Sequence, residues 1–204
     1  MNGAQVIDFF ENIIEDSIDG DTAYVLMNNA KNKVEEERDW EMLKKLQTAS
    51  AGSSAIALPA DYRTTLQIYV NNQTYSQIPF EQKNLFANSA LRWYLDFANS
   101  NIYLLGSNIT GTFNHFYKKT TDDIDEDSSP VWPTRFHPLL AFEMAELYFA
   151  IDQGDRPRSW DDKWNTQKQL LRLAMVDWDT QLKRRANENA MPPDSEPEYD
   201  LSQM

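Results

Sequence analysis

The middle of this chain differs in texture from both ends, and this difference constrains the fold more than any other feature of the sequence. Residues 56–119 contain short runs of β-branched and aromatic side chains separated by Asn, Gly and Ser turns, which is typical of antiparallel strands. The segments on either side carry apolar residues at helical spacing. The sequence therefore predicts a helical protein interrupted by a β-rich insertion.

Two helices are expected before the insertion. Residues 4–18 place apolar side chains at helical intervals, and Asp19-Gly20-Asp21-Thr22 provides a helix stop followed by a new cap. A second helix is expected from residue 23 to about residue 46, and small residues at 48–54 form a linker after it. We therefore assign residues 1–50 to the N-terminal helices of a bundle.

We assign residues 51–120 to the β-rich insertion, which is expected to form a small antiparallel sheet. Asn71-Asn72-Gln73 is typical of a turn between two of its strands. The candidate strands are residues 65–70, 74–78, 92–97, 101–105 and 111–117.

Residues 121–190 are expected to hold an acidic loop and the C-terminal helices of the bundle. Pro138 can open an apolar helix, and Ser159 can cap a long final helix. Residues 191–204 are acidic and contain three prolines, so we expect a flexible tail that can order on binding. The expected fold class is α+β and mainly α: a bundle of about four helices with an antiparallel β insertion between the second and third.

Composition excludes several classes of function. The chain lacks Cys, so it can form neither disulfides nor thiolate metal sites, which fits a reducing cytosol. Its net charge of −13 argues against tight nucleic-acid binding. Residues 139–151 are too few and too charged to span a bilayer, and the first residues lack the pattern of a signal peptide. We expect no association with a membrane.

The sequence offers no convergent set of reactive residues. His115 and His137 lack neighbours that would complete a triad or a zinc site, so we interpret both as structural. The acidic loop at 122–129 lacks the Gly and the spaced Glu of a calcium loop, and a solvated loop is the simpler interpretation. We expect no catalytic residue, no metal and no cofactor.

Several phrases of the sequence together resemble the head-to-tail adaptor, or head completion, proteins of tailed bacteriophages. The resemblance covers about residues 20–185 and includes the order of two helices, a β insertion, a helix and a long helix. The phrases that carry it are Leu58-Pro59-Ala60-Asp61-Tyr62-Arg63, Thr112-Phe113-Asn114-His115-Phe116-Tyr117 and Phe136-His137-Pro138-Leu139-Leu140, with residues 30–43 before the insertion.

The resemblance implies a structural virion protein and not an enzyme. In such proteins about 12 copies form a ring that binds the capsid portal, continues the DNA channel and receives tail or nozzle proteins. DNA would pass without sequence-specific binding, which suits an acidic chain. The implied location is the head–tail interface of the virion, after assembly in the host cytoplasm. The alternatives are a tail completion or tail-terminator ring protein, a DNA-packaging helper, and a small enzyme without a recognisable motif.

Aromatic residues are the candidate contact points. The stripe of Trp160, Trp164 and Trp178 on the final helix fits either a core or a subunit interface. The insertion holds more aromatics than a small sheet can bury, so it is expected to touch tail proteins. The candidate subunit or portal contacts are Trp160, Trp164, Trp178, Tyr199 and Leu201, and the candidate tail-facing residues are Tyr69, Tyr75, Trp93 and Tyr94.

Overall fold

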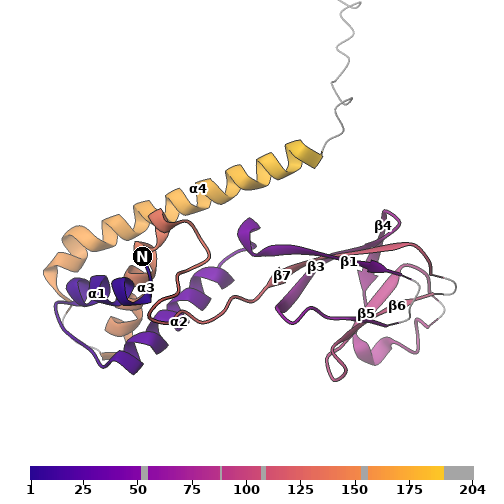
Figure 1. Ribbon diagram of the computed structural model, residues 1–204, viewed down its shortest axis with the longest axis horizontal. Coiled ribbons are helices and arrows are strands. Elements are labelled where there is room, and N and C mark those ends of the chain that lie inside the picture. The colour runs from indigo at the N-terminus through magenta and orange to yellow at the C-terminus, as the bar shows by residue number, and fades with distance from the viewer. Residues whose placement is uncertain (52–54, 88, 107–108, 153–155, 191–204) are drawn as a thin grey trace, which may run out of the picture. The chain divides into compact units, whose positions relative to one another are not determined.

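The computed structural model describes residues 1–51, 55–87, 89–106, 109–152 and 156–190 (Figure 1). The chain divides into two compact units. The helical unit comprises residues 1–42 and the chain from residue 123 onward, and the β unit comprises Leu43–Asp122. The β unit is therefore inserted between the second and third helices of the other unit.

The described part of the helical unit contains four α-helices packed around α3. They are α1 (Gly3–Ile14), α2 (Gly20–Glu36), α3 (Pro138–Asp152) and α4 (Asn165–Ala190). A π-helical turn, Trp160–Trp164, leads into α4, and a short 3-10 turn, Thr134–Phe136, precedes α3. α3 is apolar on nearly every side and contacts α1, α2 and α4, as expected for the central helix of a bundle.

Helix α2 ends at Glu36, ten residues before the end that its sequence predicts. The buried indole of Trp40 donates from Nε1 to the carbonyl oxygen of Val34 at 2.7 Å, which satisfies one of the carbonyls left open at a helix end. The next residues form strand β1 (Lys44–Ser50), whose seven residues all pair with strand β7 (Thr112–Lys119). The expected second helix to about residue 46 is therefore wrong over its last ten residues.

The acidic loop after the β unit is hydrogen-bonded to the first residues of α1, so it is not only a solvated segment. The backbone amides of Gly3 and Ala4 donate to the carbonyl oxygens of Ser128 and Glu126, at 2.9 and 3.2 Å. Ile124 of the loop is buried. The loop therefore caps the exposed amides of α1 through backbone carbonyls.

Strands β1 to β7 of the β unit form one mixed sheet in the order β1-β7-β3-β4-β5-β6-β2. All neighbours pair antiparallel except β4 and β5, which run parallel. The connection between those two strands contains a 3-10 turn, Phe80–Gln82. The remaining strands are β2 (Ala55–Ala57), β3 (Tyr62–Val70), β4 (Gln73–Gln77), β5 (Arg92–Asp96) and β6 (Asn101–Leu105).

This sheet corrects the predicted fold class. The chain is not a mainly α protein with a small antiparallel insertion, because its seven strands form a mixed, nearly closed barrel with its own core. The edge strands β1 and β2 approach each other, and the side chain of Gln47 on β1 donates to the carbonyl oxygen of Ala57 on β2 at 2.9 Å. The barrel core contains Ile68, Val70, Tyr75, Trp93, Leu95, Ile102, Leu104 and Phe113.

The turn between β3 and β4 is confirmed, and it depends on a neighbouring glycine. Asn71 and Asn72 both adopt positive φ, as a tight hairpin turn requires. The Asn71 amide accepts from the backbone of Thr112 at 3.0 Å and donates to the carbonyl oxygen of Thr110 at 2.7 Å. Gly111 lies between these contacts with φ +116°, and a Cβ there would collide with the Asn71 side chain.

We therefore expect Gly111→Ala to destabilise the β unit by about 1.5 kcal/mol, since it adds both backbone strain and a clash. Thermal unfolding of the purified variant measures the loss. Gly20→Ala is the matched control, because a Cβ at Gly20 meets nothing within 4 Å. An unchanged melting temperature for Gly111→Ala would contradict the geometry of this turn.

Candidate functional site

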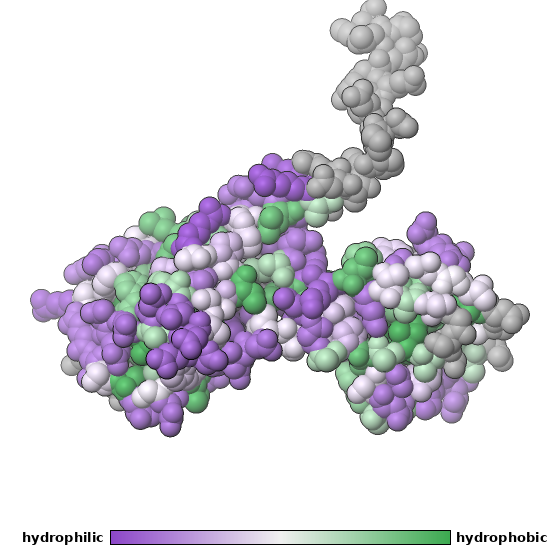
Figure 2. Space-filling model, viewed as in Figure 1, coloured by the Kyte–Doolittle hydropathy of each residue, from purple (hydrophilic) through white to green (hydrophobic). Residues whose placement is uncertain are grey.

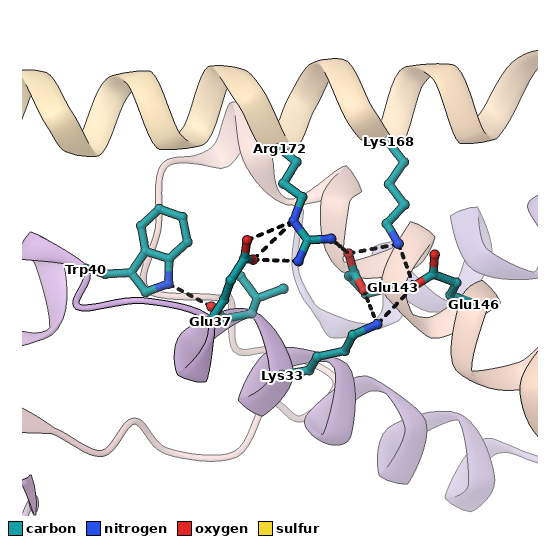
Figure 3. A network of polar contacts seen from close by, with 8 residues as sticks. Lys33, Glu37, Trp40, Glu143, Glu146, Lys168 and Arg172 are labelled. Atoms are coloured by element: carbon teal, nitrogen blue, oxygen red, sulfur yellow. Dashed lines mark hydrogen bonds and ion pairs between the residues drawn. The ribbon is translucent and has the colours of Figure 1, made fainter.

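Six charged side chains from α2, the C-cap residue that follows it, α3 and α4 form a network inside the helical unit (Figure 3). Glu143 on α3 is fully buried and lies 2.8 Å from Lys33 Nζ, 3.0 Å from Lys168 Nζ and 3.4 Å from Arg172 Nη1. Lys168 is also buried and reaches Glu146 at 2.6 Å. The members are Lys33, Glu37, Glu143, Glu146, Lys168 and Arg172.

The network contains three cations and three carboxylates, and its contacts favour the charged forms of Glu146, Lys33 and Arg172. Burial alone would raise the pKa of Glu146, but hydrogen bonds from Lys168 and Lys33 outweigh it and lower this pKa to about 2. Burial would lower the pKa of Lys33, yet its bonds to Glu143 and Glu146 raise it. The Glu37 carboxylate raises the pKa of Arg172. A general acid or base needs a pKa near the working pH, and the pKa values of Glu146 and Lys33 are shifted away from it, so these two groups suit helix anchoring.

A second buried carboxylate fastens α4 to the segment after α2. Asp179 accepts the backbone N–H of Glu41 at 2.6 Å, and its other oxygen lies 3.3 Å from Arg38 and 2.8 Å from Lys183. The inner side of α4 thus combines the charged residues Lys168, Arg172 and Asp179 with the fully buried apolar residue Met175.

Two leucines lie on the outer side of α4, where the side chains of Leu170 and Leu173 are 62% and 66% exposed. Beside them is a hollow of about 310 Å³, open to solvent. The space-filling view shows hydrophobic areas breaking the hydrophilic surface of the chain (Figure 2). The hollow, called the α4 groove below, is lined by Arg135, Phe136, Leu171, Ala174, Asp177, Trp178 and Gln181.

The three predicted contact tryptophans differ in exposure. Trp160 is 1% exposed and packs edge-on against Phe149, so it belongs to the core. Trp164 is half-buried against Phe9 and Phe142. Trp178 is also half-buried and forms one wall of the α4 groove. The other two candidates, Tyr199 and Leu201, lie outside the described residues.

The predicted tail-facing residues also differ in exposure. Tyr75 and Trp93 point into the barrel core, where Trp93 Nε1 donates to the Tyr75 carbonyl oxygen at 3.2 Å. Their side chains are therefore not part of an outer surface. Tyr94 lies on the outer face and stacks on Tyr103, with ring centres 5.1 Å apart and planes at 7°.

Tyr69 also lies on the barrel exterior, where its ring centre is 6.0 Å from that of Phe116 and the two rings pack edge to face. Leu170 and Leu173 were missed as candidates because they lie off the tryptophan stripe. Two apolar residues away from the buried side of an otherwise polar helix were the available signal.

Both histidines occupy structural positions. His137 directly precedes α3, and its Nε2 lies 2.9 Å from the carbonyl oxygen of Trp132, so it holds the segment before the helix. His115 is fully buried in the barrel and lies 3.0 Å from both Thr65 Oγ1 and Gln47 Oε1. Burial lowers the His115 pKa to about 4, so the ring is neutral at ordinary pH.

The described residues hold no group of three or more His, Asp or Glu side chains arranged to bind a metal ion. Within the same residues, no helix combines the length and the apolar character that crossing a bilayer requires. Comparison with models of known protein families finds no match, and comparison with curated proteins finds no relative in sequence.

Proposed function

We propose that this chain is a structural ring subunit of a tailed-phage virion, an adaptor between the capsid portal and the tail. The observation that carries the proposal is that charged side chains are paired in the interior while apolar side chains of α4 are exposed. Six charged residues pair with one another inside the helical unit, while α4 exposes Leu170 and Leu173 beside a groove with both apolar and charged walls. Such a surface suits assembly with other protein surfaces better than it suits chemistry.

Two further features support this proposal. The β unit is an inserted domain with a separate core, and it exposes Leu85 and Phe97 to solvent. These two exposed apolar side chains are available for contact with other proteins. The excess of acidic residues over basic residues also favours a channel wall past which DNA moves without adhering.

The test is assembly with the portal ring of the same virion. We expect the chain to associate with isolated portal rings at micromolar concentration, and electron microscopy should then reveal a second ring of about 12 copies coaxial with the portal. A capsid protein from the same virion serves as the control for non-specific adhesion. Absence of association with the portal at these concentrations would contradict the proposal.

A further inference from the structure

We propose that residues 194–201 of the C-terminal tail bind back onto the helical unit of their own chain, in an apolar hollow beside the second half of α4. This inference concerns the single chain, so it stands or falls apart from the ring proposed above.

The hollow lies between α4 and the segment that precedes α3, has a volume of about 460 Å³ and is open to solvent. Apolar side chains supply most of its wall, and Val131 among them is 47% exposed. None of the described residues that line it is an Asp or Glu, whereas the neighbouring α4 groove, which shares Trp178, contains Asp177. The hollow, called the Val131 hollow below, has in its wall Met42, Pro130, Val131, Pro133, Trp178 and Leu182.

A row of side chains on α4 leads from the hollow towards the tail. Trp178, Leu182 and Arg185 follow at intervals of four and three residues, so they lie on one side of the helix. Arg185 is exposed, and among the residues that the structure describes it forms no ion pair. Because α4 extends to Ala190, a chain that turns back after the helix passes Arg185 first and the Val131 hollow next.

The sequence of the tail complements this row. The tail contains four carboxylates and no Lys or Arg, so it is attracted to the guanidinium of Arg185. Tyr199 and Leu201 supply apolar side chains for the hollow. The acidic residues Asp194 and Glu196 come before them, which is the order in which a returning chain meets Arg185 and then the hollow. An acidic segment also suits the Val131 hollow better than the α4 groove, where a carboxylate would repel it.

The length of the tail matches the distance that it has to cover. Twelve residues of helix separate Trp178 from Ala190, which corresponds to roughly 18 Å. The eight residues from Asp194 to Leu201 span up to about 26 Å when extended, so the residues before them are left for the turn. A short tether holds a segment at an effective concentration on the order of millimolar, so even a weak contact fills the hollow. The chain's own tail is therefore its occupant.

The experiment places a nitroxide label on the tail of the full-length chain and measures its effect on the indole N–H resonances of the tryptophans. The chain contains no Cys, so Gln203→Cys directs the label to one position just beyond the proposed contact. We expect the label to reduce the Trp178 signal roughly threefold relative to the Trp160 signal, since a tethered segment with a fitting site is mostly bound. Trp160 lies before the other end of α4 and serves as the internal reference. Equal signals for the two tryptophans would overturn the inference.

A tail variant separates binding from the effect of the tether alone. Tyr199→Ser combined with Leu201→Ser removes the apolar side chains and keeps the length and charge of the tail, so the selective loss of the Trp178 signal should disappear. An equal loss in this variant would show that chain connectivity alone brings the label near Trp178, which overturns the inference.

A charge variant tests the path over Arg185. Arg185→Gln is expected to weaken binding of the tail about two- to fivefold, the range of an exposed ion pair. Arg158→Gln is the matched control, because it removes the same charge from an exposed position before the other end of α4. Equal effects of the two substitutions would contradict this path.

A mixture identifies the copy that supplies the tail. Nitroxide-labelled chain without nitrogen-15 is mixed with unlabelled nitrogen-15 chain, so that only a tail from another copy can reduce the observed signals. We expect no reduction of the Trp178 signal in this mixture. A reduction as strong as in the directly labelled chain would assign the hollow to the tail of a second copy and overturn the inference. None of these measurements involves the portal, so their failure leaves the proposed function to its own test.

Discussion

Replacing Glu143 with Gln is expected to cost about 3 kcal/mol of stability in the helical unit. The reason is the burial of its partners. Lys168 is 1% exposed and lies 3.0 Å from Glu143, so loss of this carboxylate leaves its ammonium with Glu146 alone. Lys33 and Arg172 lose the same neighbour. The midpoint temperature of thermal unfolding, followed by the circular dichroism of the helices, should fall by roughly 10 °C.

Two controls separate the network from a general effect of charge. Asp161→Asn removes the same charge from an exposed position and is expected to change stability by less than about 0.5 kcal/mol. Glu146→Gln should cost less than Glu143→Gln, because the Glu146 side chain is 36% exposed and water can replace part of its interactions. Equal losses for Glu143→Gln and Asp161→Asn would mean that the network does not hold the helices together.

A double-mutant cycle tests the pairing directly. Glu143→Met combined with Lys168→Met should cost less than the sum of the two single changes, because the double variant leaves no buried charge without its partner. Strict additivity would show that Glu143 and Lys168 are not coupled across α3 and α4.

An element could be predicted from the sequence where the residues of that segment alone show the pattern typical of a helix or a strand. Strands β3 to β7 could be predicted because their β-branched and aromatic residues lie between Asn and Gly turns. Strand β1 could not, because its sequence is rich in good helix formers. Its half-buried residues include Gln47 and Ala49, and so it lacks an apolar alternation. Pairing of all seven residues with β7 decides its conformation, and that partner is remote in sequence.

The parallel pairing of β4 with β5 was missed for a related reason. The long connection between these strands contains turn residues like those of the hairpins, so local pattern did not distinguish it from an antiparallel link. The candidate contact surface on α4 was partly accessible from sequence. Trp178 was identified, but its groove also needs Arg135 and Phe136, which tertiary structure alone brings beside α4.

Lowering the pH from 7 to 5 is expected to remove about 2 kcal/mol of stability from the β unit through His115 alone. Burial lowers the pKa of this ring from 6.5 to about 4. The unfolded chain therefore takes up a proton near pH 6.5, and the folded chain does so only near pH 4. The stability that depends on the neutral ring is complete above about pH 6.5 and is lost progressively as the pH falls towards 4.

The hydrogen bonds of His115 show which contact is lost when the ring is protonated. Because Gln47 Nε2 donates to the Ala57 carbonyl oxygen, Gln47 Oε1 faces the ring and accepts from His115 Nδ1. His115 Nε2 then accepts from the Thr65 hydroxyl. Protonation of Nε2 removes that acceptor and so breaks the hydrogen bond between His115 on β7 and Thr65 on β3.

The surroundings of His115 hold little that would offset its protonation. The rings of Tyr62, Phe113 and Tyr117 pack around it. The carboxylate of Asp61 is engaged by the Tyr117 hydroxyl at 2.9 Å and by Lys45. These contacts lower the pKa of Asp61 despite the opposing effect of burial, with the hydrogen bond from Lys45 the leading cause. Proton uptake by His115 is therefore not balanced by a free neighbouring charge, and the cost of burying an imidazolium remains.

Urea unfolding followed through amide resonances of β7 measures the loss within the β unit. His115→Gln is the control, because Gln can retain hydrogen bonds without titrating in this range. We expect the wild-type chain to lose about 2 kcal/mol more than His115→Gln between pH 7 and pH 5. The chain has only two histidines, so the variant also assigns the His115 ring signals. A ring that titrates near pH 6.5 in the folded chain, or equal losses for the two proteins, would contradict a buried neutral imidazole inside the barrel.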